Sequence, residues 1–322
     1  MKVMVLAGGP DREREVSLMS GRQVAAALRE AGHDVIERDL SPSDTAALDE
    51  FALWQTESPG PATSGGVVFP IFHGKWGEGG GAQQLLDQRG LPYVGCRETA
   101  ARLCTDKTKT KQTLRDAGLP TPAFELLECR DENAAASSSK TFPGEISPPV
   151  VVKPNDDGSS IDLAICHDQA ALDRAWAELS ARNDALLVEQ FIRGQEMTVG
   201  VIEDEHGQPQ ALPSIHIVPA TEFYDYEAKY VRDDTQYDFD AVPPEVESRL
   251  GRLAVETFNA LGCRHLARVD MFVDESQQPW LIEVNTLPGF TTHSLLPMAA
   301  RRHGLDMPAL VDHLVQRAVA DS

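Results

Sequence analysis

The sequence predicts an α/β protein of more than one domain, and three observations carry this prediction. At 322 residues the chain is long enough for two or three domains with sizeable cores. Strand-like and helical segments alternate over about residues 1–100, which is typical of a small parallel sheet flanked by helices. Two β-rich runs flank a polar break within residues 266–285, which is the signature of a hairpin.

The first hundred residues supply the elements of the parallel sheet. A short buried strand at 3–6 is ended by Gly8-Gly9-Pro10, and apolar residues at helical spacing then continue to about Gly32. Further strands are predicted at 33–38, 67–72 and 93–94, and a polar Pro/Gly/Ser-rich loop at 54–66. We therefore predict an N-terminal α/β substrate domain over residues 1–100.

The rest of the chain divides into two further segments that both contain strands. A central domain over 101–193 combines a helix at 106–118, a surface insertion or linker at 130–149, and strands at 150–153, 161–166 and 186–190 around a helix at 172–179. A C-terminal domain over 194–322 holds more strands, a tyrosine-rich loop at 220–241, a helix after Pro243-Pro244 and a last helix.

Composition excludes several classes of function. The net charge of −21 and the pI of about 4.7 make nucleic acid and anionic membranes poor partners. Five cysteines without C-x-x-C spacing argue against a structural zinc site and a disulfide framework. No apolar run approaches the length of a membrane span, and the start of the chain lacks the pattern of a signal peptide. These features predict a soluble, cytoplasmic protein.

The hairpin at 266–285 carries the most informative pattern. If its turn is centred between Ser276 and Gln277, Asp270 faces Glu283 and Arg268 faces Asn285, all on one face. Directly opposed carboxylates repel each other, and a hard cation with oxygen ligands, such as Mg²⁺, would offset that repulsion. The alternative is a solvated, charged face on which Arg268 neutralises one acid.

The segment NTLPGFTTHSLLP at 285–297 follows the hairpin directly. Its Pro and Gly residues predict an irregular turn, and Ser294 is a candidate N-cap of the next helix. Such a turn brings backbone N–H groups beside the proposed metal, where they suit a reacting anion.

A strand followed by a Gly-Ser turn, VVVKPNDDGSS at 150–160, is a candidate phosphate site. Lys153 ends the strand, and the turn offers backbone and hydroxyl donors at Gly158 and Ser159. The alternative is a plain hairpin turn. The chain lacks the Walker A and G-x-G-x-x-G patterns, which argues against a P-loop enzyme and an NAD-dependent oxidoreductase.

Three more segments contain candidate ligands but are ambiguous alone. VEQFIRGQEMTV at 188–199 predicts two strands paired across Arg193-Gly194, with Glu189 and Glu196 either nucleotide acceptors or ordinary charges. FHGKWGEGGGAQQLLD at 72–87 is a Gly-rich loop that opens a helix, with His73 and Glu78 as substrate ligands or as polar loop residues. FYDYEAKY at 223–230 is a candidate lid that excludes water, and Lys107 lies on a Lys-rich helix that alone predicts a solvated face.

Six blocks of this sequence, in order, resemble the D-alanine–D-alanine ligase family: GGPDREREVSLMSG (8–21), IFHGKWGEGGG (71–81), VVVKPNDDGSS (150–160), FYDYEAKY (223–230), ARVD (267–270) and IEVNTLPGFTTHS (282–294). The resemblance covers nearly the whole chain, and six ordered blocks are far more specific than one. It implies an ATP-grasp fold whose central and C-terminal sheets clasp ATP. It also implies ligation of two D-alanines through D-alanyl phosphate, with release of ADP and phosphate, for peptidoglycan precursor synthesis.

The resemblance further implies a role for each matching residue. The nucleotide would be held at its phosphates by Lys107 and Lys153, and at its adenine and ribose by Glu189, Gln190, Phe191, Ile192 and Glu196. Two Mg²⁺ ions, with Mn²⁺ as a possible substitute, would be bound by Asp270, Glu283 and Asn285. The first D-alanine would contact Glu13, with its partners Ser159 and Tyr230, and His73. The second would contact Lys229, Ser294 and Leu295, and the oxyanion donors would be Arg268 and the Gly289 N–H. A homodimer is the implied assembly.

One departure from the family pattern concerns the phosphate loop. The family usually continues GSS with Val-Gly, whereas Ile161-Asp162 stands here, which adds negative charge near ATP and removes backbone freedom. Two alternatives stay open: a ligase with another second substrate such as D-lactate, and a nucleotide-binding protein with weakened catalysis, which Asp162 favours. Lys229 with Tyr230 matches the dipeptide-forming pattern.

Overall fold

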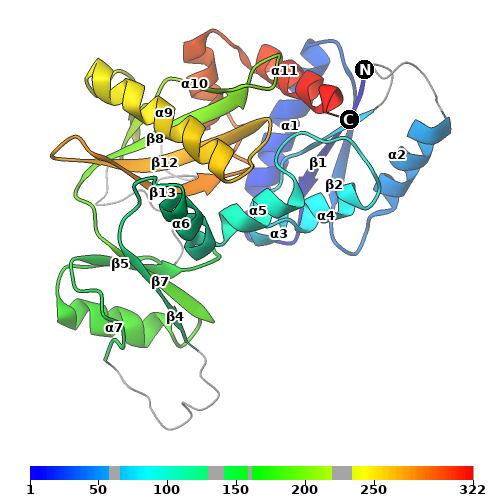
Figure 1. Ribbon diagram of the computed structural model, residues 1–322. Helices are drawn as coiled ribbons and strands as arrows, with labels where there is room; N and C mark the ends of the chain where they lie inside the picture. Colours follow the sequence, from blue (N-terminus) through cyan, green and yellow to red (C-terminus); the bar gives the residue numbers. More distant parts are fainter. Residues whose placement is uncertain (58–65, 130–140, 159–161, 220–233, 322) are drawn as a thin grey trace.

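The computed structural model describes residues 1–57, 66–129, 141–158, 162–219 and 234–321, and they form a mixed α/β fold with three sheets (Figure 1). The predicted α/β class is therefore confirmed. In Figure 1 the sheet of β4, β5 and β7, with helix α7, lies below the other two sheets and their helices.

The N-terminal sheet is parallel with the strand order β2-β1-β3, as predicted. Its region contains β1 Lys2–Gly8, α1 Arg14–Glu30, β2 Asp34–Leu40, α2 Ala46–Glu57, β3 Val67–Pro70, α3 Lys75–Glu78, α4 Gly81–Asp87 and α5 Glu98–Thr105. The strand predicted at 93–94 is reduced to a single bridge between Val68 and Tyr93. The loop predicted from Trp54 is wrong at its start, because α2 continues through Glu57.

The central sheet is antiparallel with the order β4-β7-β5-β6. The segment contains α6 Lys107–Asp116, β4 Phe124–Glu128, β5 Val150–Pro154, β6 Ala164–Cys166, α7 Gln169–Leu179 and β7 Ala185–Gln190. Its core is separate from the others and is closed by the edge-to-face pair of Phe142 and Trp176.

The C-terminal sheet has the order β11-β10-β8-β12-β13, with β9 paired to β8. The segment contains β8 Gly194–Glu203, β9 Pro209–Ala211, β10 Ile215–Val218, β11 Gln236–Asp238, α9 Pro244–Ala260, β12 Leu266–Asp274, β13 Pro279–Asn285, α10 Leu295–His303 and α11 Met307–Ala320. Strand β12 is hydrogen-bonded on both sides, by β8 and β13, which holds it firmly in the sheet.

The hairpin predicted across Arg193-Gly194 is wrong. Strand β7 pairs with β4 and β5, whereas β8 pairs with β10, β12 and β9 in the other sheet. Residues 191–193 therefore carry the chain from one sheet to the next. Two short β-rich runs around a turn do not specify that they pair with each other, because each run found more extensive partners elsewhere.

Hydrophobic cores cross the predicted domain boundaries. One core joins residues of β1, β3 and α1 to residues of α10 and α11. Another includes Cys104 and Leu114, from α5 and α6, together with residues of β8, β12 and α9. The division at residues 100 and 193 stays a prediction. Helices α5 and α6 both contact β13 of the C-terminal sheet, and α6 also contacts β4 of the central sheet.

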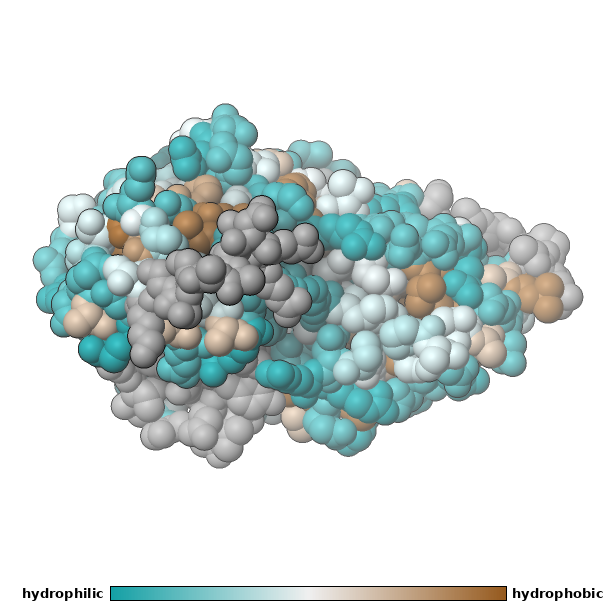
Figure 2. Space-filling view, turned by 90° about the horizontal axis from the view of Figure 1, so that it is seen from below, coloured by the Kyte–Doolittle hydropathy of each residue, from teal (hydrophilic) through white to brown (hydrophobic). Residues whose placement is uncertain are grey.

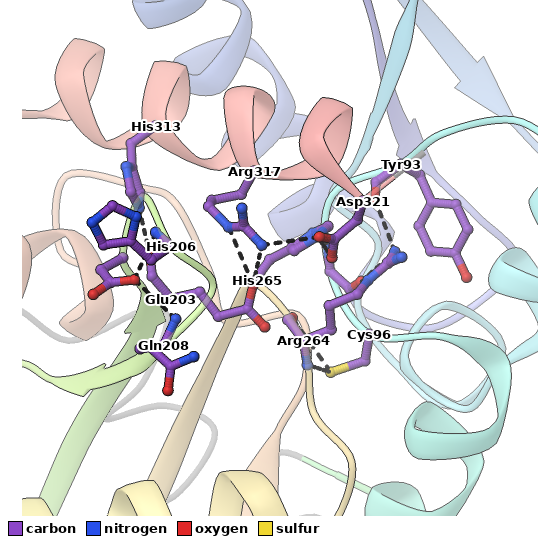
Figure 3. A network of polar contacts seen from close by, with 12 residues as sticks. Tyr93, Cys96, Glu203, His206, Gln208, Arg264, His265, His313, Arg317 and Asp321 are labelled. Carbon is purple, nitrogen blue, oxygen red and sulfur yellow. Dashed lines mark hydrogen bonds and ion pairs between the residues drawn. The ribbon is translucent and has the colours of Figure 1, made fainter.

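A buried polar network joins the N-terminal region to α11 (Figure 3). The His265 Nδ1 accepts from the Gly95 N–H at 3.1 Å, so its protonated Nε2 donates to Asp321 at 3.1 Å. Arg317 lies between two acids and donates to Glu203 at 3.2 Å and to Asp321 at 2.9 Å. Both ring nitrogens of His265 and the carboxylates of Glu203 and Asp321 are engaged in hydrogen bonds. This cluster is therefore a structural link between elements rather than a cation site.

The surface is predominantly hydrophilic on the face in Figure 2. Among the residues with a described position, only Met19 and Leu53 are exposed large hydrophobic side chains. No helix in the described part of the chain is long and apolar enough to cross a membrane. All five cysteines are free thiols.

We expect His265 to make stability depend on pH. Burial, with a smaller contribution from Arg264, lowers the pKa of His265 to about 3, although Asp321 opposes the shift. An unfolded histidine binds a proton near pH 6.5. The stability that neutral, buried His265 contributes to the fold is therefore fully present above that pH and is lost as pH falls toward 3. Lowering the pH from 7 to 5 should therefore reduce the free energy of unfolding by about 2 kcal/mol.

The measurement is urea unfolding at both pH values for the parent protein and for His265→Asn. Asparagine tolerates the left-handed backbone of this position, where φ is 63°. The variant should be less stable at pH 7 and lose less stability on acidification. The exposed His206 supplies the control, since His206→Asn should keep the parental pH dependence. Equal pH dependence in the parent and His265→Asn would contradict the assignment.

Candidate active site

Two adjoining cavities lie where the three sheets meet, and they share part of their walls. The first is lined by the N-terminal loops, the phosphate loop and the segment 283–295. The second lies between the central and C-terminal sheets, with a more apolar wall. The residues common to both are Lys107, Asp157, Gly158, Arg268 and Glu283. A ligand in one cavity therefore meets a ligand in the other at a boundary lined by two cations and two acids.

Every sequence-predicted site residue that the structure describes lines one of these cavities. The first cavity contains Glu13, His73, Lys107, Arg268, Glu283, Asn285, Gly289, Ser294 and Leu295. The second contains Lys107, Lys153, Glu189, Gln190, Phe191, Ile192, Glu196, Arg268, Asp270 and Glu283. Ser159, Lys229 and Tyr230 lie outside the described residues, as does the part of the predicted lid at 220–241 that precedes residue 234. The end of that segment is not all loop, because strand β11 forms at Gln236–Asp238. Apart from Lys107, which lines both, the residues predicted for the substrates and those predicted for the nucleotide lie in different cavities.

The predicted register of the β12–β13 hairpin is confirmed at the site. Asp270 pairs with Glu283 and Arg268 with Asn285. Beyond Asp270 a bulge shifts the register, so that Met271 pairs with Leu281 and the turn is centred half a residue earlier than predicted. The bulge is the reason that the acids still face each other across the ladder.

Asp270 is held by three donors of the same sheet. Arg268 donates to both its oxygens, at 2.9 Å and 2.7 Å, in a bidentate pair. The Thr198 hydroxyl donates at 2.5 Å and the Asn285 amide at 3.0 Å. Thr198 was missed from the sequence, because its place beside Asp270 depends on the pairing of β8 with β12.

The oxygen atoms of Asp270, Glu283 and Asn285 are suitable ligands for a hard cation. Two carboxylates face each other on neighbouring strands, and the Asn285 amide turns its nitrogen to Asp270, which leaves its oxygen as the atom to offer a cation. Orientation of a ligating carboxylate by such neighbours is the usual arrangement in metal sites.

The N-terminal loops bring Glu13 and His73 to the first cavity. Asp11 accepts from the backbone N–H groups of Trp76 and Gly77, at 2.9 Å and 3.3 Å, which ties the loop after β1 to helix α3. Glu13 is the buried N-cap of α1. The His73 Nδ1 lies 3.3 Å from Glu78, and among the described atoms its buried Nε2 has no hydrogen-bond partner. That nitrogen is suited to a polar ligand.

The turn before α10 presents Gly289 and Ser294. Ser294 is at the N-cap position as predicted, but its side chain does not cap the helix. Its hydroxyl instead accepts from the Thr291 N–H at 2.9 Å. A Cβ at Gly289 would lie 2.7 Å from that hydroxyl oxygen, so a larger residue here would displace the Ser294 side chain.

The phosphate loop after β5 is anchored to the start of α6. Asn155 accepts from the Thr108 N–H and donates to Asp106, each at 2.9 Å. Lys107 donates to the carbonyl oxygen of Asp157, and burial lowers the pKa of its ammonium. Lys75 of α3 forms an ion pair with Asp156, which connects the loop to the N-terminal region.

The negative charge of Asp162 is compensated by a neighbouring arginine. Its carboxylate accepts from Arg182 at 2.9 Å and 3.1 Å, and it lines neither of the two cavities described above. Its φ of 58° shows that this aspartate adopts the left-handed conformation that glycine favours. The added charge is therefore paired locally.

The second cavity combines an apolar wall with a buried charge cluster. Val151 and Ile165 of the central sheet face Met271 and Phe272 of β12 across it. At its end Lys153 donates to Glu189, which is also paired with Lys111 at 2.7 Å. Lys111 was missed from the sequence, although its spacing of four residues from Lys107 places both on one helix face.

Comparisons with known proteins agree with this geometry. A family model described as D-ala D-ala ligase C-terminus matches residues 113–316. The D-alanine–D-alanine ligase B of Chromobacterium violaceum is 43% identical over 305 residues, which cover 94% of this chain and 93% of the relative. A D-alanine–D-alanine ligase of Bacillus anthracis, crystallised with ATP, is 28% identical with a TM-score of 0.77 and coverages of 100% and 98%. The VanG D-Ala:D-Ser ligase of Enterococcus faecalis is 27% identical with a TM-score of 0.78 and coverages of 98% and 99%.

We expect the Thr198 hydroxyl to tune cation binding through Asp270. Thr198→Val removes the donor at nearly constant volume, and the less constrained carboxylate should weaken the affinity for a divalent cation by about tenfold. Binding of Mn²⁺ in the presence of ATP, followed by electron paramagnetic resonance, measures this affinity. Thr257→Val is the control, because Thr257 is equally buried but lies on α9 away from both cavities. Unchanged Mn²⁺ affinity in Thr198→Val would rule out this role.

Proposed function

This chain belongs to the D-alanine–D-alanine ligase family, and from this premise we propose that its two cavities join two D-alanines at the expense of ATP. The relative from Chromobacterium violaceum aligns over 94% of this chain and 93% of its own length, so the activity is proposed for the chain as a whole. In this family the dipeptide serves peptidoglycan synthesis. ATP use has direct support from the ATP complex of the B. anthracis neighbour.

The single observation that carries this function is the shared boundary of the two cavities. A ligation of this kind needs a phosphoryl donor and a carboxylate acceptor in contact, since carboxylate and amine do not condense in water. Lys107, Arg268 and Glu283 line both cavities. The γ-phosphoryl group of ATP in the second cavity then meets the carboxylate of the first D-alanine at this boundary.

The second cavity is assigned to the nucleotide. Its apolar wall from Val151, Ile165 and Met271 suits an adenine ring. The crossing segment supplies the backbone groups of Gln190 and Ile192 to the adenine edge, beside Phe191, and Glu196 lies on the same wall for the ribose. Lys107 and Lys153 lie at the phosphate end.

The opposed acids are assigned to Mg²⁺. Asp270, Glu283 and Asn285 would hold two ions, or Mn²⁺ in their place, and the bound ions supply neutralisation of the charge on the transferring phosphoryl group. The protein's own contribution is orientation, because Thr198 and Arg268 fix the Asp270 carboxylate before any ligand arrives.

The first cavity is assigned to the amino acids. Buried Glu13 receives the ammonium group of the first D-alanine, and the unpartnered His73 Nε2 faces its carboxylate region. Ser294 and Leu295 flank the second D-alanine. The carboxylate of the first D-alanine takes the γ-phosphoryl group of ATP, and ADP leaves. The amine of the second D-alanine, after loss of a proton to solvent, attacks the acyl phosphate, and phosphate leaves as the peptide bond forms. Arg268 and the Gly289 N–H stabilise the oxyanion of this step.

Two further proposals accompany this function. A homodimer is proposed from the family resemblance, and a cytoplasmic location from the requirement for ATP. The domains are proposed as 1–100 for substrate binding, and 101–193 and 194–322 for the ATP-grasp. Ser159 and Tyr230 are proposed as partners of Glu13, and Lys229 as a contact of the second D-alanine.

A catalytically weakened nucleotide-binding protein is the less favoured reading. Its motivation was the aspartate at position 162, and the pairing of Asp162 with Arg182 removes that motivation. The identity of the second substrate is the sharper alternative, since one structural neighbour is a D-Ala:D-Ser ligase.

Phosphate release with different amino acids tests the substrate assignment. We expect ATP-dependent phosphate release with D-alanine, accompanied by an equal amount of dipeptide, and none with L-alanine. D-Lactate or D-serine added to limiting D-alanine should give little mixed product, as measured by mass spectrometry. Release with L-amino acids alone would overturn the substrate assignment, and a predominant mixed product would favour the alternative.

Arg268→Ala separates chemistry from nucleotide binding. Loss of one oxyanion donor should lower kcat by about 10²–10³. ATP affinity should stay within about threefold, because Asp270 keeps Thr198 and Asn285 as donors. Turnover assays and calorimetric titration with MgATP measure the two effects, and Arg302→Ala, an exposed site on α10, is the control. Parallel losses of turnover and ATP affinity would refute the assigned role.

A further inference from the structure

Lys111 is a fully buried lysine that lines neither cavity. It lies on α6, four residues after Lys107, and its side chain has no exposed surface. Its ammonium donates to the Thr121 hydroxyl at 2.9 Å and lies 2.7 Å from Glu189 Oε2. Burying an ammonium group is costly unless it is paired, so a lysine in this position needs a specific reason.

The partner of Lys111 is shared with a lysine of the nucleotide cavity. Glu189 is 3% exposed, and its other oxygen, Oε1, accepts from Lys153. Burial would raise the pKa of Glu189, but Lys111 and Lys153 together lower it to about 2, so the carboxylate is ionised. One negative charge therefore stands between two positive charges, and the buried cluster carries a net charge of +1.

The two lysines differ in what they are free to do. Lys153 lines the nucleotide cavity, whereas Lys111 is enclosed. The Thr121 hydroxyl that accepts from Lys111 donates in turn to the Leu281 carbonyl oxygen on β13 at 2.9 Å. Lys111 is thereby fixed from both the central and the C-terminal sheets, and only Lys153 has a cavity into which it can turn.

We propose that Lys111 is a positioning residue: it is the permanent counter-ion of Glu189, and it frees Lys153 to exchange this carboxylate for the phosphates of a bound nucleotide. With Lys153 as its sole partner, Glu189 would be left as an unpaired buried carboxylate whenever Lys153 turned to the phosphates, and this would oppose binding. The inference rests on the proposed function, because it assumes ATP in the second cavity.

Binding measurements in the absence of D-alanine test the inference. In Lys111→Met, which nearly conserves volume, the affinity for MgATP should fall by at least about tenfold. The affinity for adenosine, measured by competition with ATP, should change by less than about twofold, because adenosine has no phosphate for Lys153. A similar loss of affinity for both ligands would mean that Lys111 acts only on the shape of the pocket, and would overturn the proposal.

A double variant tests whether Lys111 acts through Glu189. In Lys111→Met/Glu189→Gln the carboxylate is absent and Lys153 is released, so MgATP affinity should match that of Glu189→Gln alone within about threefold. A double variant that binds MgATP clearly more weakly than Glu189→Gln overturns the proposal. This comparison decides the question alone if Lys111→Met does not fold, as judged by circular dichroism. Lys111→Arg keeps the charge and should retain more affinity than Lys111→Met.

Two controls separate this inference from the proposed function. Lys109→Met removes an exposed lysine of the same helix and should bind MgATP as the parent does. If the parent protein binds no MgATP, the proposed function fails. If the parent binds MgATP and Lys111→Met binds it equally well, only the role of Lys111 fails.

Discussion

The antiparallel ladder between β12 and β13 is the constraint on which the cleft depends. It sets Asp270 against Glu283, two like charges that a folded protein separates unless something compensates them. Here the compensation is built in, since Arg268, Thr198 and Asn285 all donate to Asp270. Because β12 is bonded on both sides, this costly arrangement cannot relax by fraying, and the acids stay available in one geometry.

A second theme is the contrast between a strongly acidic chain and a cationic interior. The chain carries a net charge of −21, yet Lys107, Lys111, Lys153 and Arg268 converge on the junction of the sheets. Lys107 is bonded to a loop carbonyl, Lys153 to Glu189 and Arg268 to Asp270. In the proposed function, binding of a polyphosphate would exchange these partners for phosphate oxygens, and each cation already lies close to that position.

Local patterns in the sequence predicted those features of the structure that depend on residues close together in the chain. The α/β class and the parallel N-terminal sheet follow from periodicity and turn chemistry. The predicted pairing of Asp270 with Glu283 is confirmed only because a bulge compensates for the displaced turn. The false hairpin across Arg193-Gly194 shows the limit, since the choice of strand partner is a property of the whole sheet. Lys111 and Thr198 were missed for the same reason: their chemistry depends on burial and on neighbours that are 70 or more residues away.

The common wall of the two cavities has a practical consequence for chemical probes. A single molecule that joins an adenine-like ring to a short zwitterionic tail would span Lys107 and Arg268 and occupy both compartments at once. Its second half would then dock at a high effective concentration, so two weak fragments could combine into a tight bisubstrate inhibitor without any new contact. The length of the linker, set by the boundary at Glu283, would decide whether that gain is realised.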